Sequence, residues 1–315
     1  YSNPFAKVPV GRVRYGLMLR EDGICYDDGT TARLAENHFV MTTTTANAVL
    51  VYRNMEFARQ CLFPDLDVHI ISTTDQWAQF AVAGPNSRAV LSKIIDNVDM
   101  SNNGFPFMAC SDVTVCGGTP GRLFRISFSG ELAYEVAVPA RYGDALIREI
   151  ISAGEEFNIT PYGTEALGVM RIEKGHVTGA ELNGQMTAFN INMNNMISTK
   201  KDSIGSVLSR REVMVADDQV RLVGVKTIKK SDSLSSGAHF LAENDKPTTQ
   251  NDQGWITSVC YSPHFEQHIG LGFLERGHER HGEVLRAWDG IRGTDVLVEI
   301  VSSHMYDPEG GLQRG

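Results

Sequence analysis

The stretch L-F-R-I-S-F-S-G-E-L-A-Y-E-V-A-V-P, residues 123–139, decides what this part of the chain can form. Apolar and polar residues alternate over 123–128 and again over 134–139, with a Ser-Gly pair between them, so the stretch predicts two antiparallel strands joined by a turn. Two glutamates, Glu131 and Glu135, fall in or beside this turn. A strand glutamate is most often a solvated residue that keeps a hairpin soluble. A functional role for either one therefore needs support from the rest of the chain.

Length and composition indicate an ordinary globular protein. The 315 residues are enough for two or three packed lobes, and 42% of them are hydrophobic and 21% charged. The formal net charge is -9, and the 29 Lys and Arg residues are scattered. Because phosphate binding needs a clustered basic surface, we expect no nucleic-acid partner.

The cysteines and the apolar runs predict where the protein works. The five cysteines are odd in number and show no C-x-x-C spacing, which indicates reduced thiols and a cytoplasmic location. No apolar run reaches the roughly 18 residues of a membrane span, and no signal peptide is visible, so we expect no membrane partner. We expect no metal site. The chain opens Y-S-N-P-F without Met, and we expect further residues ahead of Tyr1.

Strand and helix patterns alternate through the first 210 residues, as in α+β folds. Helix patterns are predicted over 46–62, 85–95, 141–153 and 164–174, and further strand patterns over 11–19, 37–43, 68–72 and 80–84. In the first of these helices we expect one buried face, made of Leu50, Val51, Asn54, Ala58 and Cys61. Thr164 is predicted to cap the last helix at its start, and Gly175 to end it.

The last third of the chain has a different character. Short strand patterns follow one another with Gly-rich turns, over residues 220–226, 255–261, 269–274, 283–288 and 295–301. Closely spaced strands of this kind predict a compact antiparallel barrel or sandwich. We therefore divide the chain into residues 1–212 and 213–315.

Two adjacent acids, Asp27 and Asp28, stand beside a strand pattern in G-I-C-Y-D-D-G-T-T. Adjacent carboxylates repel each other unless one is exposed and the other finds a donor. An Asx-type turn explains the pair without any function. The alternative is a functional acid at the end of an ordered strand, where it orients an amine or accepts its proton.

Four motifs together point to one family. They are Y-G-L-M-L-R-E-D-G-I-C-Y-D-D-G (15–29), F-S-G-E-L-A-Y-E (128–135), P-Y-G-T-E-A-L-G-V-M-R-I-E-K-G (161–175) and Y-D-P-E-G (306–310). In order and spacing these motifs resemble the folate-binding aminomethyltransferase family, which includes the glycine-cleavage T-protein. The likeness covers nearly the whole chain and is greatest for one branch, the C-terminal half of sarcosine oxidase alpha subunits.

The resemblance implies a fold and a site. The family fold is a three-lobed ring of two α+β folate-binding lobes and a C-terminal antiparallel β-barrel, with tetrahydrofolate in the central channel. By position, Asp28 corresponds to the catalytic acid, and Tyr15, Thr44, Phe128 and Glu135 correspond to residues that contact the folate. At Thr44 the T-protein has Asn, and at Phe128 it usually has Tyr, so both residues favour the oxidase branch.

The resemblance also gives Glu135 a chemical task. A pterin edge presents a ring N–H beside an amino group, and an ionised carboxylate offers two acceptors at a matching separation. Each such charge-assisted hydrogen bond contributes about 1.5–3 kcal/mol. We therefore expect Glu135 to hold the pterin, and Glu131 to shape the turn.

The function implied for the chain is folate-dependent one-carbon transfer within a sarcosine oxidase, which converts sarcosine, O2 and tetrahydrofolate to glycine, H2O2 and 5,10-methylenetetrahydrofolate. The substrates at this domain are tetrahydrofolate and an imine from a methylated amine, and flavin enters only through a partner subunit. Two alternatives remain: a stand-alone glycine-cleavage aminomethyltransferase, and a non-catalytic folate-binding assembly factor. The basic residues Arg171, Lys174, Lys200 and Lys201 either bind the anionic folate tail or serve as ordinary helix-end cations.

Overall fold

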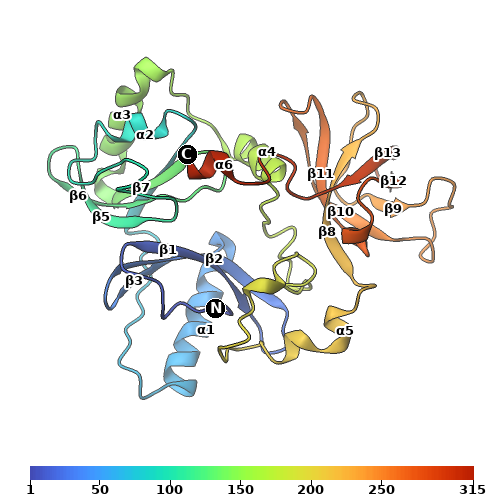
Figure 1. Cartoon of the computed structure of the whole chain (residues 1–315), viewed down its shortest axis with the longest axis horizontal. Helices are drawn as coiled ribbons and strands as arrows, with labels where there is room; N and C mark the ends of the chain where they lie inside the picture. The colour runs from blue at the N-terminus through green and yellow to red at the C-terminus, as the bar shows by residue number, and fades with distance from the viewer.

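The computed structural model describes residues 1–315, and its elements form three lobes around a common centre (Figure 1). Each lobe is built on a sheet of its own. The first two lobes combine a sheet with helices, and the third is a closed barrel. The architecture is therefore α+β with a C-terminal barrel, as the sequence predicts.

The first lobe contains a three-stranded antiparallel sheet, β1 (Arg12–Leu19), β2 (Cys25–Ala35) and β3 (His38–Met41). A short 3-10 turn, Thr45–Asn47, leads into α1 (Ala48–Phe57), which continues as a π-helical turn, Ala58–Leu62. Val51 is the buried residue of α1, whereas Leu50 and Cys61 are exposed. The buried face predicted for this helix is therefore wrong at these two positions.

The strand predicted over residues 68–72 is absent, and this prediction is wrong. The segment V-H-I-I-S alternates in the right way, but it pairs with no strand of the chain. Alternation shows which residues suit a ladder, while a strand also needs a neighbour to pair with. Val68 and Ile71 are consequently exposed.

The second lobe is a four-stranded antiparallel sheet in the order β4-β7-β6-β5. Helices α2 (Ser87–Leu91) and α3 (Gly143–Gly154) add Leu91, Leu146 and Ile150 to its apolar core. The bounds of its strands are β4 Trp77–Ala83, β5 Cys110–Val115, β6 Thr119–Phe124 and β7 Ala133–Pro139.

The hairpin of residues 123–139 pairs as predicted, but with a longer connection. Strand β6 ends at Phe124, opposite Glu135, so residues 125–132 form a loop instead of extending the strand to Phe128. The Ser127 hydroxyl accepts a hydrogen bond from the Gly130 amide at 3.1 Å, and Gly130 has φ 89°. Local side-chain contacts of this kind compete with the ladder. They explain why the pairing stops early.

The third lobe is a closed antiparallel barrel in the order β10-β11-β8-β13-β12-β9. Closure confirms the barrel that the family resemblance implies and settles the choice between barrel and sandwich that the strand patterns alone left open. Five of the strands match predicted patterns, and the three-residue β9 has no pattern long enough to predict. The strand bounds are β8 Val220–Thr227, β9 His239–Leu241, β10 Gly254–Ser262, β11 Gln267–Glu275, β12 Val284–Asp289 and β13 Thr294–Val301.

Helix α4 (Thr164–Lys174) lies between the second lobe and the barrel and packs against β10 and β11 (Figure 1). It ends at Gly175 with φ 81°, as predicted, whereas the Thr164 side chain makes no capping hydrogen bond. Two short helices complete the structure, α5 (Glu212–Val215) and α6 (Gly311–Arg314). None of the helices combines the length and the apolar character needed to cross a membrane.

Two apolar clusters join the lobes. Val13 and Ala32 of the first lobe pack with Cys110, Phe124 and Ile126 of the second. A larger cluster joins the first lobe to the barrel, with Leu17, Leu19 and Cys25 on one side and Leu222, Ile269, Leu271 and Phe273 on the other. The first lobe is therefore fixed to both of its neighbours by buried apolar surface, the main favourable contribution to folding.

Candidate functional site

Tyr15 on β1 and Asp28 on β2 meet across the sheet of the first lobe. The register places Tyr15 opposite Thr30 and Asp28 opposite Leu17, so the two side chains lie diagonally on one face. The Tyr15 hydroxyl donates a hydrogen bond to Asp28 Oδ2 at 2.7 Å. The same hydroxyl lies 3.9 Å from the sulfur of Met193, which belongs to the loop after α4.

The surroundings of Asp28 favour its protonated form. Burial is the largest cause that raises the pKa of Asp28, and the neighbouring Asp27 adds to it, whereas hydrogen bonds from Tyr15 and Thr44 act in the opposite direction. Burial, followed by the charge of Asp28, raises the pKa of Tyr15, which keeps the phenol protonated as a donor. Asp28 is thus a carboxylate suited to accept a proton.

Asp27 and Asp28 lie within β2, so the Asx-turn interpretation of the pair is wrong. Consecutive strand residues point to opposite faces, which separates the two carboxylates. Asp27 is 1% exposed and accepts hydrogen bonds from the Thr44 amide at 3.1 Å and from Asn47 Nδ2 at 3.2 Å. Asp27 therefore holds the segment whose Thr44 side chain reaches Asp28.

Glu135 lies on β7 and faces away from the core of the second lobe, because its neighbours Tyr134 and Val136 belong to that core. Gln79 on β4 donates a hydrogen bond to Glu135 Oε2. Burial raises the pKa of Glu135 to about 7, and the Gln79 hydrogen bond acts against this. The ligand-free protein therefore favours the protonated form of Glu135 more than an ordinary exposed glutamate does.

Phe128 lies in the loop between β6 and β7, and 40% of it is exposed. Its ring stacks on His176 with centroids 5.7 Å apart and planes inclined by 26°. One face of the Phe128 ring is thus supported by the protein, and the ring is still accessible to a ligand.

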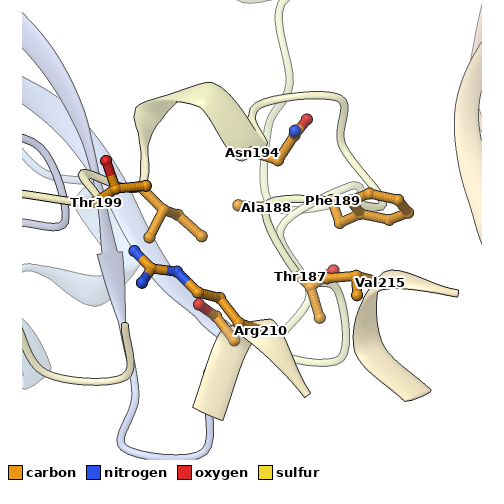
Figure 2. A pocket seen from close by; sticks show the side chains of 9 residues that line it. Thr187, Ala188, Phe189, Asn194, Thr199, Arg210 and Val215 are labelled. Carbon is orange, nitrogen blue, oxygen red and sulfur yellow. The ribbon is translucent and has the colours of Figure 1, made fainter. Parts of the chain in front are cut away.

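The predicted residues form two groups on different lobes. Tyr15, Asp28 and Thr44 come together on the first lobe, while Phe128 and Glu135 lie at the hairpin of the second. No hydrogen bond or ion pair joins the two groups. One cavity of about 200 Å³ lies elsewhere, among residues 187–215, and includes none of these five residues (Figure 2).

Arg171 and Lys174 are each paired with an acid of the chain, which favours a structural role for both over the folate-tail alternative that the sequence left open. The Arg171 guanidinium pairs with the buried Glu181 at 3.1 Å, and the Lys174 ammonium pairs with Asp307 at 2.9 Å. Lys201 donates to two backbone carbonyls near the start of the chain, and Lys200 is exposed.

Two further residues near Glu135 were missed from the sequence. Gln79 is its hydrogen-bond partner, and the charge of Glu135 helps to raise the pKa of Tyr162 after the larger contribution from burial. Gln79 is the one polar residue of the strand W-A-Q-F-A-V-A, which was the available signal. Its pairing with Glu135 depends on the register of β4 against β7, which the sequence does not show. No group of three or more His, Cys, Asp or Glu side chains is arranged to hold a metal ion.

Comparison with known families agrees with this geometry. Residues 1–201 match the GCVT N-terminal domain, and residues 221–307 match the glycine cleavage T-protein C-terminal barrel domain. The chain therefore belongs to the glycine-cleavage T-protein family, whose members include folate-dependent aminomethyltransferases.

Within the family, the chain is 48% identical over 311 residues to the sarcosine oxidase subunit alpha of Rhizobium meliloti (strain 1021). That match covers 98% of this chain and 31% of the relative, so the chain spans about a third of its length. Identity to the aminomethyltransferase of Listeria welshimeri is 27%, over 97% of this chain and 79% of the relative.

A solved structure supports the fold. The crystal structure of glycine cleavage system aminomethyltransferase T from Bartonella henselae is similar, with a TM-score of 0.82 over 98% of this chain and 80% of that chain. The sequence identity is 19%. The predicted fold of two α+β lobes and a C-terminal barrel is thus confirmed.

Proposed function

We propose that this chain is the tetrahydrofolate-binding part of a sarcosine oxidase alpha subunit and transfers a one-carbon unit to the folate. The overall reaction is sarcosine, O2 and tetrahydrofolate to glycine, H2O2 and 5,10-methylenetetrahydrofolate. The observation that carries the proposal is the 48% identity to a sarcosine oxidase alpha subunit across 98% of the chain. Flavin is supplied by a partner subunit, and the protein acts in the cytoplasm.

Glu135 fits the pterin end of the folate. It is a half-buried carboxyl with the Gln79 amide as its hydrogen-bond partner and no cation within ion-pair distance, and burial raises its pKa to about 7. Such a group is stabilised by a ligand that brings two donors and no competing charge. A pterin edge has this pattern of donors, and Phe128 offers a ring at the same hairpin for stacking.

Asp28 fits the reacting end. When bound, tetrahydrofolate supplies the amine that accepts the one-carbon unit. Asp28 orients this amine and takes its proton, a task for which a raised carboxyl pKa is favourable. Tyr15 holds the carboxylate through its hydrogen bond to Oδ2, so the carboxylate keeps one orientation toward the amine.

The experiment compares wild type and Asp28→Asn, each co-purified with its flavin-bearing partner. During sarcosine turnover with tetrahydrofolate, the assay measures H2O2, free formaldehyde and 5,10-methylenetetrahydrofolate. We expect the variant to form H2O2 at the wild-type rate while its carbon appears as formaldehyde. An equal yield of 5,10-methylenetetrahydrofolate from both proteins would contradict the role of Asp28.

The same preparation separates the alternatives. A chain that purifies without a flavoprotein and releases ammonia from an aminomethylated lipoyl carrier is a stand-alone glycine-cleavage aminomethyltransferase. A chain that binds reduced folate but changes neither product yield nor formaldehyde release is a binding or assembly factor.

A further inference from the structure

The loop that carries Phe128 is bonded to the second lobe at its two ends, Arg125 and Leu132, and its middle makes no backbone hydrogen bond to the sheet. Residues 125–132 lie between the end of β6 and the start of β7. Within this loop the Ser127 hydroxyl accepts the Gly130 amide at 3.1 Å, but this contact is local and fixes only the turn. The direction of the Phe128 ring must therefore be set by contacts from outside the hairpin.

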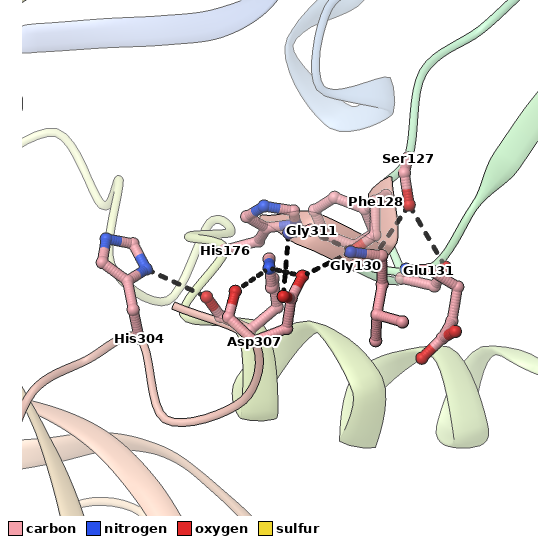
Figure 3. A network of polar contacts seen from close by, with 11 residues as sticks. Ser127, Phe128, Gly130, Glu131, His176, His304, Asp307 and Gly311 are labelled. Atoms are coloured by element: carbon pink, nitrogen blue, oxygen red, sulfur yellow. Dashed lines mark hydrogen bonds and ion pairs between the residues drawn. The ribbon is translucent and has the colours of Figure 1, made fainter. Parts of the chain in front are cut away.

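His176 makes such contacts with Phe128. Its Nδ1 lies 2.8 Å from the carbonyl oxygen of Phe128, and its ring stacks on the Phe128 ring (Figure 3). Because a carbonyl only accepts, the hydrogen must sit on Nδ1, and this selects one tautomer of the neutral ring. Burial is the main cause that lowers the pKa of His176, followed by the charges of Lys174, His304 and Arg171, while the bond to Phe128 acts against them.

The backbone of His176 is fixed as firmly as its ring. Gly175 ends α4 with φ 81°, and the His176 amide then donates to the Arg171 carbonyl at 2.9 Å. Any Cβ at Gly175 would lie 2.4 Å from the Ser303 carbonyl, so this turn packs directly on the segment after the barrel. His176 therefore projects from a rigid point.

The turn at Gly130 rests on Lys174. The ammonium pairs with Asp307 Oδ2 at 2.9 Å, and His304 Nδ1 contacts the Lys174 carbonyl at 3.0 Å. A Cβ at Gly130 would lie 2.9 Å from the Lys174 stem, so the loop lies flat against it. Lys174 supports the turn at Gly130, while His176 supports Phe128 itself.

We propose that His176 is a positioning residue for the folate site: its Nδ1–H holds the Phe128 carbonyl, so that the Phe128 ring presents its free surface to a bound folate. This inference rests on the proposed function. It assigns the positioning role to Nδ1 of the imidazole. Replacing His176 by side chains that place a donor at Nδ1, near Nε2 or nowhere tests this assignment.

Three substitutions separate the contributions of the ring. Asparagine in His176→Asn places an N–H donor close to the position of Nδ1, glutamine in His176→Gln places one near Nε2, and His176→Phe keeps the stacked ring without a donor. The matched control is His278→Phe, at a half-exposed histidine in a turn of the barrel. Binding of 5-formyltetrahydrofolate, a stable reduced folate, is measured by calorimetry for the full chain. Hydrogen exchange of the Gly130 and Glu131 amides reports on the loop.

We expect His176→Asn to bind within about twofold of wild type, and His176→Gln and His176→Phe to bind about three- to tenfold more weakly, as for one lost hydrogen bond. The rate of hydrogen exchange at the Gly130 and Glu131 amides should rise in His176→Gln and His176→Phe only. In the complete enzyme the KM for tetrahydrofolate should rise by the same factor while kcat stays unchanged, because Asp28 is untouched.

Wild-type affinity in all three variants would overturn the inference, and so would an equal loss in all three, since this would indicate a direct ligand contact through the imidazole. A wild-type chain that binds no reduced folate would instead refute the proposed function. The exchange data would then still decide whether His176 holds the loop. The two failures are thus distinguishable.

Discussion

Folate binding should depend on pH through Glu135, and Glu135→Gln should remove that dependence. In the ligand-free protein burial raises the pKa of Glu135 to about 7. The ionised fraction is then about one tenth at pH 6, about one half at pH 7 and about nine tenths at pH 8. If only the ionised carboxylate accepts both pterin donors, affinity rises about tenfold from pH 6 to pH 8, which is about 1.4 kcal/mol.

The assay is calorimetric titration with 5-formyltetrahydrofolate at pH 6, 7 and 8 for wild type, Glu135→Gln and the neighbouring control Glu131→Gln. The tail carboxylates of the folate are ionised throughout this range, so they do not contribute to the change of affinity with pH. Other groups of the protein that titrate here affect all three proteins equally. Folate affinity that does not change with pH in wild type would refute the role of Glu135 as an ionised acceptor for both pterin donors. The same conclusion would follow if the affinity of Glu135→Gln still rose with pH.

The stability of the ligand-free protein should change with pH in the opposite direction. The pKa of Glu135 in the folded protein, about 7, lies above the ordinary glutamate value of 4.5, so folding favours the protonated form. This contribution is fully present below about pH 4.5 and is lost as pH rises through 7, with an upper limit of about 3 kcal/mol. The free energy of unfolding in urea should fall less between pH 5 and 8 in Glu135→Gln than in wild type.

Three other substitutions test the rest of the site. Asp28→Asn should lower the single-turnover rate of transfer by about 100-fold or more while folate affinity stays within a few-fold, and an equal loss of both would contradict a catalytic role. Tyr15→Phe removes a hydrogen bond that lowers the pKa of Asp28, so the acid limb of the kcat/KM profile should move to higher pH; an unmoved limb would contradict this. Asp307→Asn leaves the Lys174 ammonium buried without its ion partner and should lower the free energy of unfolding by about 3 kcal/mol in urea titrations, whereas an unchanged value would show that the pair is neutral for stability.

Local patterns predicted most of the elements because each depends on a few neighbouring residues. Gly175 ends α4 where a glycine is needed for a positive φ, and the barrel strands follow their own alternation. Two features were beyond such patterns. Closure of the barrel depends on pairing between distant strands, and the segment 68–72 has the alternation of a strand without a partner.

The residues of the candidate site were found through resemblance, and their local chemistry only through the structure. Tyr15 and Asp28 are 13 residues apart and meet because of the register of β1 and β2. The roles of Arg171 and Lys174 stayed open because their acidic partners lie 10 and 133 residues away. The raised pKa of Glu135 likewise depends on burial by several segments, which no motif describes.

The three junctions between lobes differ in chemistry, and this has a consequence for the site. The first lobe, with Asp28, joins both neighbours through apolar clusters, whereas the Lys174–Asp307 pair joins the end of α4, beside the second lobe, to the segment after the barrel. The Phe128 loop lies on this polar junction, through Gly130. Loosening the junction should therefore weaken folate binding at Phe128 while leaving the Tyr15–Asp28 pair intact. For Asp307→Asn we thus expect a higher KM for tetrahydrofolate with kcat unchanged, and a loss confined to kcat would contradict this coupling.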